Sequence, residues 1–495
     1  MPASIATSLY TAAQVRAIDR AAIDELGIPG IVLMERAARA AWASLRARWP
    51  EASRILLLIG RGNNGGDAYL LGELALREGV AVQAWTLGNP ATADAQQARR
   101  RFLDAGGACA DAVAPTPVPE VDVIVDGMFG TGLARPIQGV AADWIGRARR
   151  SGVPVLALDV PSGLDADCGM PLGPVLIADA TITFVALKRG LFTADGPDCC
   201  GRVELAPLDI PDAAYRRLAA DAVLLADDAL TTLPPRARNV NKGSFGRVLV
   251  LGGGTGMGGA VRLAGEAALR CGAGLVAVAT HPANVAALHA GRPELIAHAI
   301  ENVAQLVPLL DSATVLAIGP GLGRTEWARA LFDHAVVSAL PMVIDADALN
   351  LLAEAPRALS PGRVLTPHPG EAARLLGCTV ADIQHDRFAA VRTMAKRFSA
   401  SVVLKGAGSL IADPDGSVAV CPWGNPGMAS AGMGDVLTGV IAALLAQEMP
   451  AFDAACRGVA LHARAGDVAA GDAPAGLIAS DLFVPLRRLV NGHPA

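Results

Sequence analysis

The sequence has no excess of positive charge, no membrane-length apolar run and no paired pattern among its few cysteines. Its 42 basic residues are outnumbered by 47 acidic ones, which leaves a net charge of −5 and no broad positive field for nucleic acid. The eight cysteines include no CxxC pair, and the adjacent Cys199 and Cys200 are interpreted as incidental. The N-terminus lacks a basic segment followed by an apolar core. These absences exclude nucleic-acid and membrane partners and predict a soluble, cytoplasmic protein.

Two common nucleotide-binding signatures are also missing or incomplete. The P-loop pattern GxxxxGK[ST] does not occur, so P-loop phosphoryl transfer is excluded as a template. The pattern GxGxxG occurs twice, at Gly60, Gly62 and Gly65, and again at Gly254, Gly256 and Gly259. A dinucleotide site also needs an acidic residue after the second strand. No carboxylate ends the strand predicted at 81–87, and none lies between Glu266 and Glu294. A dinucleotide oxidoreductase is therefore weakly supported.

The length and apolar content indicate two domains. With 495 residues, of which 52% are hydrophobic, the chain can bury two sizeable cores. A mixed polar stretch between Leu208 and the prolines at 234–235 carries no sheet signal, so we place the boundary after residue 221. Apolar runs that alternate with helical patterns on both sides of it predict an α/β fold in residues 1–221 and in residues 222–495.

Three predicted strands of the first half end in polar loops. The strands at 54–60, 121–126 and 153–159 are short apolar runs, typical of a parallel sheet. The first is followed by a predicted loop at 61–67 and a helix at 68–78. Because ligands bind beyond the carboxyl ends of parallel strands, the three loops are expected to converge on one site. Asx-turn chemistry is an equally good explanation for the first loop taken alone.

These loops resemble those of the NAD(P)H-hydrate epimerases, through Asn-Asn-Gly-Gly-Asp at 63–67, the segment from Asp126 to Arg135, and Asp-Val-Pro-Ser-Gly at 159–163. The resemblance implies that Asp159 moves the proton in interconversion of the R and S hydrates. It implies hydrate contacts from Asn63, Asn64, Gly65, Gly66, Asp67, Gly130, Thr131, Gly132, Leu133, Ala134, Arg135 and Asp159. It also implies a potassium ion held by Asn64, Asp126 and Ser162. Lys188 lies in another similar segment, where a solvated or capping lysine is an equally good interpretation.

Strand ends of the second half carry further polar groups. Asp345 and Asp347 follow a predicted strand and either orient water or magnesium or cap a turn. His368 stands between two prolines, which fix the backbone around it. Lys405 precedes Gly-Ala-Gly-Ser, and a cation followed by exposed amides suits nucleotide phosphates. Lys242 is either a phosphate contact or a solvated lysine.

A glycine-rich stretch at 423–439 precedes a buried helix. Gly427, Gly432 and Gly434 allow tight turns, and the free amides at the helix start favour an anion. Asp435 lies at the helix entrance, where a carboxylate serves either as a cap or as a base.

This stretch resembles the ribokinase-like carbohydrate kinases, and its Gly-Asn-Pro-Gly-Met lead-in is similar to that of nucleotide-dependent NAD(P)H-hydrate dehydratases. The resemblance implies that Asp435 is the catalytic base and that ADP and Mg²⁺ are required. It implies hydrate contacts from Ala260, Gly323, His368 and Asp435. It implies nucleotide contacts from Lys405, Gly406, Ala407, Gly408, Ser409 and Gly434. The family pattern Ala-Thr-Gly-Gly-Thr-Gly-Asp is changed here by Ala431 and Met433, which affects the geometry of the phosphate site.

Together these resemblances predict a Rossmann-like αβα sandwich followed by a ribokinase-like α/β domain. The expected function is repair of hydrated NADH and NADPH, by epimerisation and by ADP-dependent dehydration of the S form with release of AMP and phosphate. The partners expected are the two hydrates and ADP, and the relatives imply a homo-oligomer. The alternative is an ATP-dependent sugar or hydroxymethylpyrimidine kinase with a non-catalytic N-terminal ligand-binding domain.

Overall fold

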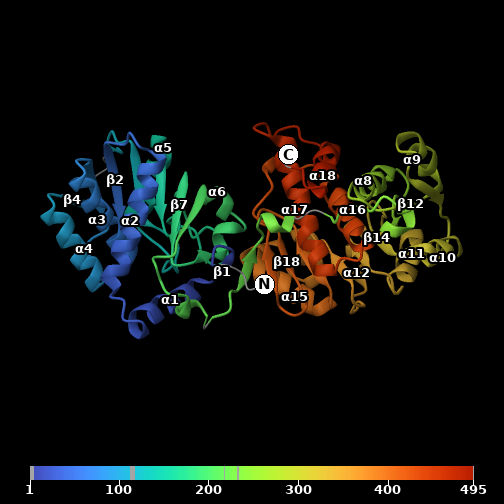
Figure 1. Ribbon diagram of the computed structural model, residues 1–495, viewed down its shortest axis with the longest axis horizontal. Coiled ribbons are helices and arrows are strands. Elements are labelled where there is room, and N and C mark those ends of the chain that lie inside the picture. The colour runs from blue at the N-terminus through green and yellow to red at the C-terminus, as the bar shows by residue number, and fades with distance from the viewer. Residues whose placement is uncertain (1–4, 112–116, 217, 231–232, 494–495) are drawn as a thin grey trace. The chain divides into compact units, whose positions relative to one another are not determined.

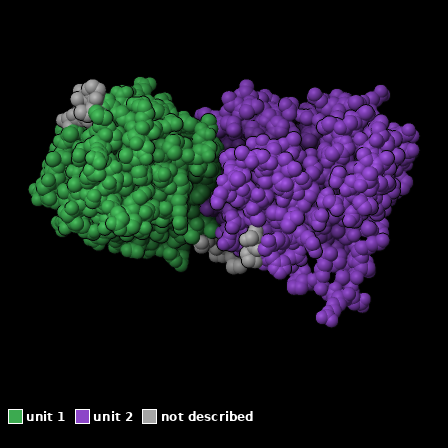
Figure 2. Space-filling view, turned by 90° about the horizontal axis from the view of Figure 1, so that it is seen from above, with its two compact units in different colours: residues 1–223 green, residues 224–495 purple. Residues whose placement is uncertain are grey.

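The computed structural model describes residues 5–111, 117–216, 218–230 and 233–493. The chain forms two compact units, Met1–Val223 and Leu224–Ala495, which are coloured separately in Figure 2. Among the described helices, none is long and apolar enough to cross a membrane. Each unit contains a mainly parallel sheet with helices packed against it (Figure 1), so the predicted α/β class is confirmed.

The sheet of the first unit has seven parallel strands in the order β4-β3-β2-β5-β6-β7-β9. Its strands are β2 (Arg54–Ile59), β3 (Ala81–Thr86), β4 (Cys109–Asp111), β5 (Val123–Gly127), β6 (Val155–Leu158), β7 (Ala180–Phe184) and β9 (Arg202–Ala206). The main helices are α1 (Ala12–Arg20), α2 (Gly30–Arg48), α3 (Asn63–Arg77), α4 (Ala93–Asp104) and α5 (Gly139–Ser151), and the short ones are α6 (Gly196–Cys200) and α7 (Asp212–Tyr215).

Both faces of this sheet are buried, as the continuous apolar strands predict. In β2, Ile55 and Leu57 belong to the core cluster that contains residues of α2 and α3. Leu56 and Leu58 point the other way, into the cluster that contains Trp144 of α5. Successive side chains of a strand alternate between the two faces, and the unit is therefore the predicted αβα sandwich.

Two local predictions for this half are wrong. The segment 63–67, expected as a loop, forms the first turn of α3. Gly60, Gly62 and Gly65 have low helix propensity. Gly60 and Gly65 are nevertheless needed, because the start of α3 lies against the end of β2. A Cβ on Gly65 would lie 2.1 Å from the carbonyl oxygen of Gly60. The stretch expected to lack strands contains β10 (Ala222–Leu224), which pairs with β1 (Ser8–Tyr10); β1 also pairs with β8 (Leu187–Lys188).

The sheet of the second unit runs in the order β13-β12-β11-β14-β15-β16-β17-β18-β19. The strands are β11 (Arg247–Leu251), β12 (Leu275–Thr280), β13 (Ile296–Ala299), β14 (Val315–Ile318), β15 (Met342–Ile344), β16 (Arg363–Leu365), β17 (Ser401–Leu404), β18 (Leu410–Ala412) and β19 (Val418–Val420). The strands from β13 to β17 are parallel, and β18 and β19 complete the sheet as an antiparallel edge.

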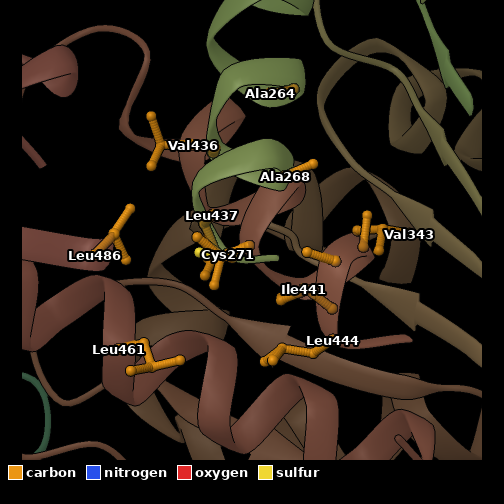
Figure 3. Packing of buried hydrophobic residues seen from close by; sticks show 14 of the residues in the cluster. Ala264, Ala268, Cys271, Val343, Val436, Leu437, Ile441, Leu444, Leu461 and Leu486 are labelled. Carbon is orange, nitrogen blue, oxygen red and sulfur yellow. The ribbon is translucent and has the colours of Figure 1, made fainter. Parts of the chain in front are cut away.

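The helices of this unit are α8 (Gly258–Arg270), α9 (Val285–Gly291), α10 (Val303–Ser312), α11 (Glu326–Ala335), α12 (Ala346–Glu354), α13 (Pro369–Leu376), α14 (Val380–His385), α15 (Arg387–Phe398), α16 (Met433–Ala446), α17 (Ala451–Ala470) and α18 (Phe483–Val490). Helix α16 is buried on almost all sides, with every residue from Val436 to Ala446 inside the core. It packs closely on α8, where a Cβ on Gly439 would lie 2.0 Å from the carbonyl oxygen of Ala264. Figure 3 shows Leu437 and Ile441 of α16 with Ala268 and Cys271 of the α8 segment. This packing fixes α16 firmly against α8.

Candidate functional site

The first unit contains a cavity of about 1100 Å³ at the carboxyl ends of its strands. Loops after β2, β5 and β6 contribute to its wall, as expected for an open parallel sheet. Among the predicted residues, the wall includes Asn63, Asn64, Asp67, Gly130, Thr131, Gly132, Leu133, Arg135 and Asp159. The predicted convergence of three distant loops is thus present in the structure.

Three of the predicted hydrate contacts do not form this wall. Gly65 and Gly66 are buried in the first turn of α3, where a Cβ on Gly66 would lie 2.5 Å from the sulfur of Met34. Ala134 is exposed and lies outside the cavity lining. Gly65 therefore lets the helix start approach the end of β2, and Gly66 lets it pack against Met34 of α2.

Asp159 lies directly after β6 and is paired with a buried lysine. Its backbone φ is 65°, and the N–H of Val160 donates to the carbonyl oxygen of Leu158 at 2.8 Å, so Asp159 is the central residue of a strained γ-turn. Its carboxylate accepts a hydrogen bond from Lys188 Nζ and another from the Thr131 N–H at 3.2 Å. The carboxylate is thus held at the cavity wall.

Lys188 precedes the short helical turn Arg189–Phe192, but its side chain is neither solvated nor used as a cap. Its side chain is completely buried, and besides Asp159 it donates to Thr183 Oγ1 at 2.9 Å and to the carbonyl oxygen of Phe184 at 2.6 Å. An ammonium group has three donors, and all three have acceptors here. The structure therefore excludes a solvated Lys188 and places its side chain beside Asp159 in the cavity wall.

Two more carboxyl groups line the same cavity. Burial is the main reason that the pKa of Asp67 lies well above its ordinary value, and the nearby charges of Asp159 and Asp19 raise it further. Burial also raises the pKa of Asp19 to about 6, with a smaller lowering by Lys188. Asp19 belongs to α1, and the sequence analysis missed it because nothing in its helical pattern distinguishes it from a surface residue.

Of the residues predicted to hold potassium, Asn64 lines the cavity, and Asp126 and Ser162 lie outside its lining. The Asp126 carboxylate is fully buried and accepts hydrogen bonds from the Ser162 N–H and Oγ–H, both at 2.7 Å. Burial raises the pKa of Asp126 to about 6, although the Ser162 hydrogen bonds oppose this rise. Asn64 Nδ2 donates to two carbonyl oxygens, those of Phe129 and Leu158.

These donors fix the amide orientation, and so the buried Oδ1 of Asn64 is left without a protein partner. A buried amide oxygen near a buried carboxylate fits a cation that prefers oxygen ligands. The residues present therefore fit the potassium ion implied by the resemblance.

In the second unit, the start of α16 presents Asp435. Gly432 is the N-cap, with a φ of 88°, so the residue with left-handed geometry is this glycine and not Ala431, whose φ is negative. The substitution at Ala431 therefore introduces no strain in the turn. Asp435 occupies the third helical position, where its backbone N–H and those before it are free for an anion.

A lysine and two carboxylates lie beside this helix start. Lys405 Nζ donates to Asp345 Oδ1 at 2.9 Å and lies 3.9 Å from Glu371 Oε2. The other oxygen of Asp345 accepts from Thr438 Oγ1 of α16 at 2.8 Å. A Cβ on Gly434 would lie 3.3 Å from Lys405 Nζ. The lysine predicted to meet phosphate thus lies directly beside the predicted anion turn.

The electrostatics of this cluster favour proton transfer near neutral pH. Burial and the charge of Asp345 raise the pKa of Asp435 to about 7, against an opposing effect of Lys405. Burial raises the pKa of Glu371 to about 7 as well. For Lys405, burial lowers the pKa, but Asp345, Glu371 and Asp435 outweigh it and raise the pKa overall. A carboxyl group whose pKa lies near the working pH suits a general base.

Most of the remaining predicted positions lie at the carboxyl ends of neighbouring strands, but Lys242 lies before β11. Asp347 accepts from the Gly323 N–H at 2.8 Å, which ties the loop after β14 to α12. His368 caps α13, and the backbone N–H groups of Gly370 and Glu371 donate to its Nδ1. Ala260 belongs to the first turn of α8. A Cβ on Gly321 would lie 3.2 Å from the Cβ of Ala260. Lys242 is exposed in a short helical turn.

The segment 406–409 after β17 forms a closed turn. Ser409 Oγ accepts from the Gly406 N–H at 3.2 Å and donates to the Gly406 carbonyl oxygen at 2.9 Å. Gly406 and Gly408 have positive φ values of 143° and 58°. A Cβ on Gly406 would lie 2.9 Å from Arg387 Nη1, so the turn rests on a buried guanidinium group. The serine hydroxyl at this position therefore shapes the loop.

The lead-in to the anion turn is held by α17. Asp467 accepts from the Gly424 N–H at 3.1 Å and from Asn425 Nδ2 at 3.0 Å, and a Cβ on Gly466 would lie 2.4 Å from the sulfur of Met428. This anchoring explains why the Gly-Asn-Pro-Gly-Met segment needs a small residue opposite it. The sequence analysis did not identify Asp467, Thr438 or Glu371, because each acts through a contact with a distant segment.

Two family models match the chain. Residues 30–190 match the family described as YjeF-related protein N-terminus, and residues 248–487 match the family described as NAD(P)H-hydrate dehydratase. The two matches fall in the two compact units separately.

Curated relatives match over almost the whole length. The bifunctional NAD(P)H-hydrate repair enzyme Nnr of Coxiella burnetii is 44% identical over 493 residues, covering 98% of this chain and 100% of that protein. The protein of the same name from Escherichia coli K12 is 42% identical, covering 99% of this chain and 95% of that one. Among solved structures, a ribokinase-like superfamily protein from Enterococcus faecalis V583 is 30% identical with a TM-score of 0.50, covering 54% of this chain and 93% of that chain.

Proposed function

The chain belongs to the family of bifunctional NAD(P)H-hydrate repair enzymes, and we propose that residues 1–221 hold its epimerase site and residues 222–495 its dehydratase site. The enzyme interconverts the R and S forms of hydrated NADH and NADPH and dehydrates the S form in a nucleotide-dependent reaction. The family assignment confirms the resemblance found in the motifs. The alternative of a sugar or hydroxymethylpyrimidine kinase has no comparable support from the curated relatives.

The observation that carries the dehydratase assignment is the position of Asp435. Its carboxyl group lies at the start of α16 beside Lys405, with a pKa raised to about 7 by burial and by Asp345. In the reaction, Asp435 accepts the proton of the hydroxyl group on the hydrated ring as the hydroxyl oxygen attacks the terminal phosphoryl group of ADP. AMP leaves, and the phosphorylated oxygen then leaves the ring as phosphate. The ring nitrogen supplies the electrons, and loss of the neighbouring proton restores the dihydronicotinamide.

Backbone amides and one lysine hold the charge that develops on the transferred group. The free N–H groups of the first turn of α16, including that of Gly434, are oriented toward an anion. Lys405 lies next to this turn, and the closed turn of Gly406, Ala407, Gly408 and Ser409 follows it. These residues form the proposed nucleotide site. Ala260, Gly323, His368 and Asp435 form the proposed hydrate site, because they lie on strand ends and helix starts of the same sheet edge.

ADP and Mg²⁺ are the proposed co-substrate and metal. The described residues contain no group of three or more carboxylate, histidine or cysteine side chains arranged for a metal ion. Mg²⁺ is commonly bound through one or two carboxylates together with substrate phosphates, so this metal would enter with the nucleotide. Bound there, it would neutralise phosphate charge during the transfer.

The proposed epimerase site is the cavity of the first unit. Asp159, held by Lys188, is the proton-transfer group, and the cavity wall from Asn63 to Asp67 and from Gly130 to Arg135 contacts the hydrate. Asn64, Asp126 and Ser162 are the proposed potassium ligands, because Asn64 Oδ1 is buried without a protein partner. A bound potassium ion would compensate the buried charge of Asp126 and fix the loop next to the cavity.

One assay tests both activities. The full chain is incubated with a mixture of R and S NADH hydrate and ADP or ATP, and the recovery of dihydronicotinamide absorbance is followed. We expect nucleotide-dependent recovery that consumes both epimers, since the epimerase site supplies the S form to the dehydratase site. A stable phosphorylated product without recovery of absorbance would support the kinase alternative. Consumption of the S form alone would contradict the epimerase assignment. We further propose that the enzyme is a homo-oligomer in the cytoplasm.

A further inference from the structure

Four aspartates line the epimerase cavity, and three of them, Asp19, Asp67 and Asp159, interact with its one buried ammonium group, that of Lys188. The ammonium group of Lys188 donates to Asp159, Thr183 Oγ1 and the Phe184 carbonyl oxygen, so none of its three protons is left for another acceptor. Among the residues that the structure describes, no cation lies within ion-pair distance of Asp67 or Asp19. One carboxyl group is therefore compensated and the other two are not.

The rest of the cavity does not supply the missing compensation. The other charged side chains in its wall are Arg16, Arg20, Arg61, Arg135 and Asp94. Arg16 donates to the carbonyl oxygen of Thr131, and Arg61 donates to that of Asn89. Asp67 is 8% exposed, and Asp159, Asp19 and Lys188 are the charged groups that act on it. A buried carboxyl group that faces two other carboxyl groups retains its proton, which agrees with the raised pKa of Asp67.

Epimerisation at the hydroxyl-bearing carbon requires both an acid and a base. The hydroxyl group is a poor leaving group unless its oxygen receives a proton, and the returning water adds readily only if it loses one. Two carboxyl groups whose surroundings favour opposite protonation states can divide these tasks. In this cavity, Asp159 forms an ion pair with Lys188, whereas burial raises the pKa of Asp67 well above its ordinary value and so favours its protonated form.

We propose that Asp67 is the general acid of the epimerase and that Asp159 is its general base. This inference rests on the proposed epimerase function of the first unit. Asp67 gives its proton to the ring hydroxyl, the carbon–oxygen bond breaks and water leaves with the bonding electrons. The ring nitrogen lone pair forms a double bond to that carbon, giving a cation. A second water adds to the opposite face, the double-bond electrons return to nitrogen, and Asp159 takes the proton. Proton exchange through water then returns Asp159 and Asp67 to their starting states.

Backbone geometry at two neighbouring strand ends supports a fixed position for the base. Asp159, after β6, and Val185, after β7, have φ values of 65° and 68°. Each is the centre of a γ-turn, closed at 2.8 Å by Val160 N–H to Leu158 O and by Ala186 N–H to Phe184 O. Such turns are strained, and a β-branched residue in this conformation is a genuine outlier. One turn carries the Asp159 carboxylate, and the other orients the Phe184 carbonyl that holds Lys188.

The test uses the full chain with pure R hydrate and no nucleotide, so that only epimerisation is observed. The reaction is run in water labelled with oxygen-18, and the S product is analysed by mass spectrometry. We expect most of the S product to carry the label in wild-type enzyme. We expect Asp67→Asn to lower kcat by about a hundredfold or more, with KM changed by less than about threefold. Asp67→Glu should recover part of kcat.

Glu73→Gln is the matched control. Glu73 is another buried carboxylate of α3, but it is paired with Arg77 and Arg101 and lies outside the cavity wall. We expect this variant to lower the thermal midpoint and to leave kcat unchanged. Asp67→Asn should keep or raise the midpoint, because an amide replaces a carboxyl group that is already neutral. The high-pH limb of the kcat profile, where Asp67 loses its proton, should disappear in this variant.

The possible results distinguish failure of the proposed role of Asp67 from failure of the epimerase function itself. A wild-type chain that does not convert R hydrate to S hydrate would overturn the epimerase function itself. A wild-type chain that converts it without incorporation of label would overturn loss and return of water, and with it the role of Asp67 as an acid. Normal kcat in Asp67→Asn, with label incorporated, would overturn the assignment of the acid to Asp67 alone.

Discussion

The pH dependence of dehydration and the loss of Asp435 together test the proposed base. With a pKa of about 7, Asp435 is ionised in about 9% of molecules at pH 6 and in about 91% at pH 8. Since only the carboxylate accepts a proton, kcat for the S hydrate should rise about tenfold between these pH values. Asp435→Asn removes the acceptor, and kcat should fall about 10²- to 10⁴-fold, which corresponds to about 3–5 kcal/mol in the activation free energy.

Asp435→Asn should lose activity but gain stability relative to the wild-type protein at high pH. The folded-state pKa of Asp435 is raised, so its contribution to stability is fully present below the unfolded-state pKa and is lost as the pH rises through about 7. Asp435→Asn avoids this loss. The variant should therefore match the wild-type free energy of unfolding at low pH and exceed it at pH 8, by at most about 4 kcal/mol.

The control is Asp382→Asn. Asp382 also occupies the third position of a helix, α14, but there it accepts from the Thr379 N–H at 2.9 Å and Oγ1 at 2.7 Å, as a capping carboxylate does. Its loss should lower stability slightly and leave kcat unchanged. The assay measures dihydronicotinamide absorbance with saturating S hydrate and ADP, alongside chemical unfolding of each variant. If Asp435→Asn kept more than about a tenth of kcat, or if kcat were flat from pH 6 to 8, the base assignment would be refuted.

Three further perturbations address the rest of the molecule. Lys188→Met should lower epimerase kcat by about a hundredfold or more, because Asp159 loses its buried cation. With S hydrate and ADP the same variant should dehydrate at the wild-type rate. A lower dehydration rate would contradict the division of function between the units. Replacing potassium by tetramethylammonium should slow conversion of R hydrate and leave dehydration of S hydrate unchanged, and equal rates in both salts would count against the site of Asn64, Asp126 and Ser162. Gly439→Ala should destabilise the second unit by about 1–3 kcal/mol in urea unfolding, because the new Cβ would lie 2.0 Å from the Ala264 carbonyl oxygen; its control is Gly259→Ala, where no atom lies within 4 Å of the new Cβ.

Much of the architecture follows from local sequence patterns. The apolar run 54–59 predicted a central strand, and β2 is buried on both faces. The apolar segment after Asp435 predicted a buried helix, and α16 is one. These inferences hold because period and burial are encoded within a few consecutive residues. The start of α3 was missed because its glycines serve a tertiary contact with Gly60, which outweighs their poor helix propensity.

The contacts inside the two sites depend on residues far apart in the chain. Lys405 and Asp345 are separated by 60 positions, and Thr438 and Asp345 by 93. Lys188 is 29 positions from Asp159. The sequence shows that a lysine follows a strand, but it does not show which carboxylate the lysine reaches. For that reason Lys188 and Asp345 were left between structural and functional interpretations until the fold brought the strand ends together.

In each unit, one lysine forms an ion pair with one carboxyl group and leaves a second carboxyl group less compensated. In the first unit, Lys188 bonds to Asp159, and no cation among the described residues lies within ion-pair distance of Asp67; in the second, Lys405 bonds to Asp345 and only partly offsets the rise in the pKa of Asp435. The roles of Asp67 and Asp435, the less compensated groups, then depend on how far burial raises the pKa of each. The pKa of Asp67 lies well above its ordinary value, which favours the protonated form and suits the proposed acid, whereas the pKa of Asp435 reaches only about 7 and suits the proposed base. The chemistry of each site is thus set less by the identity of its aspartate than by the distance of that aspartate from its lysine and from water.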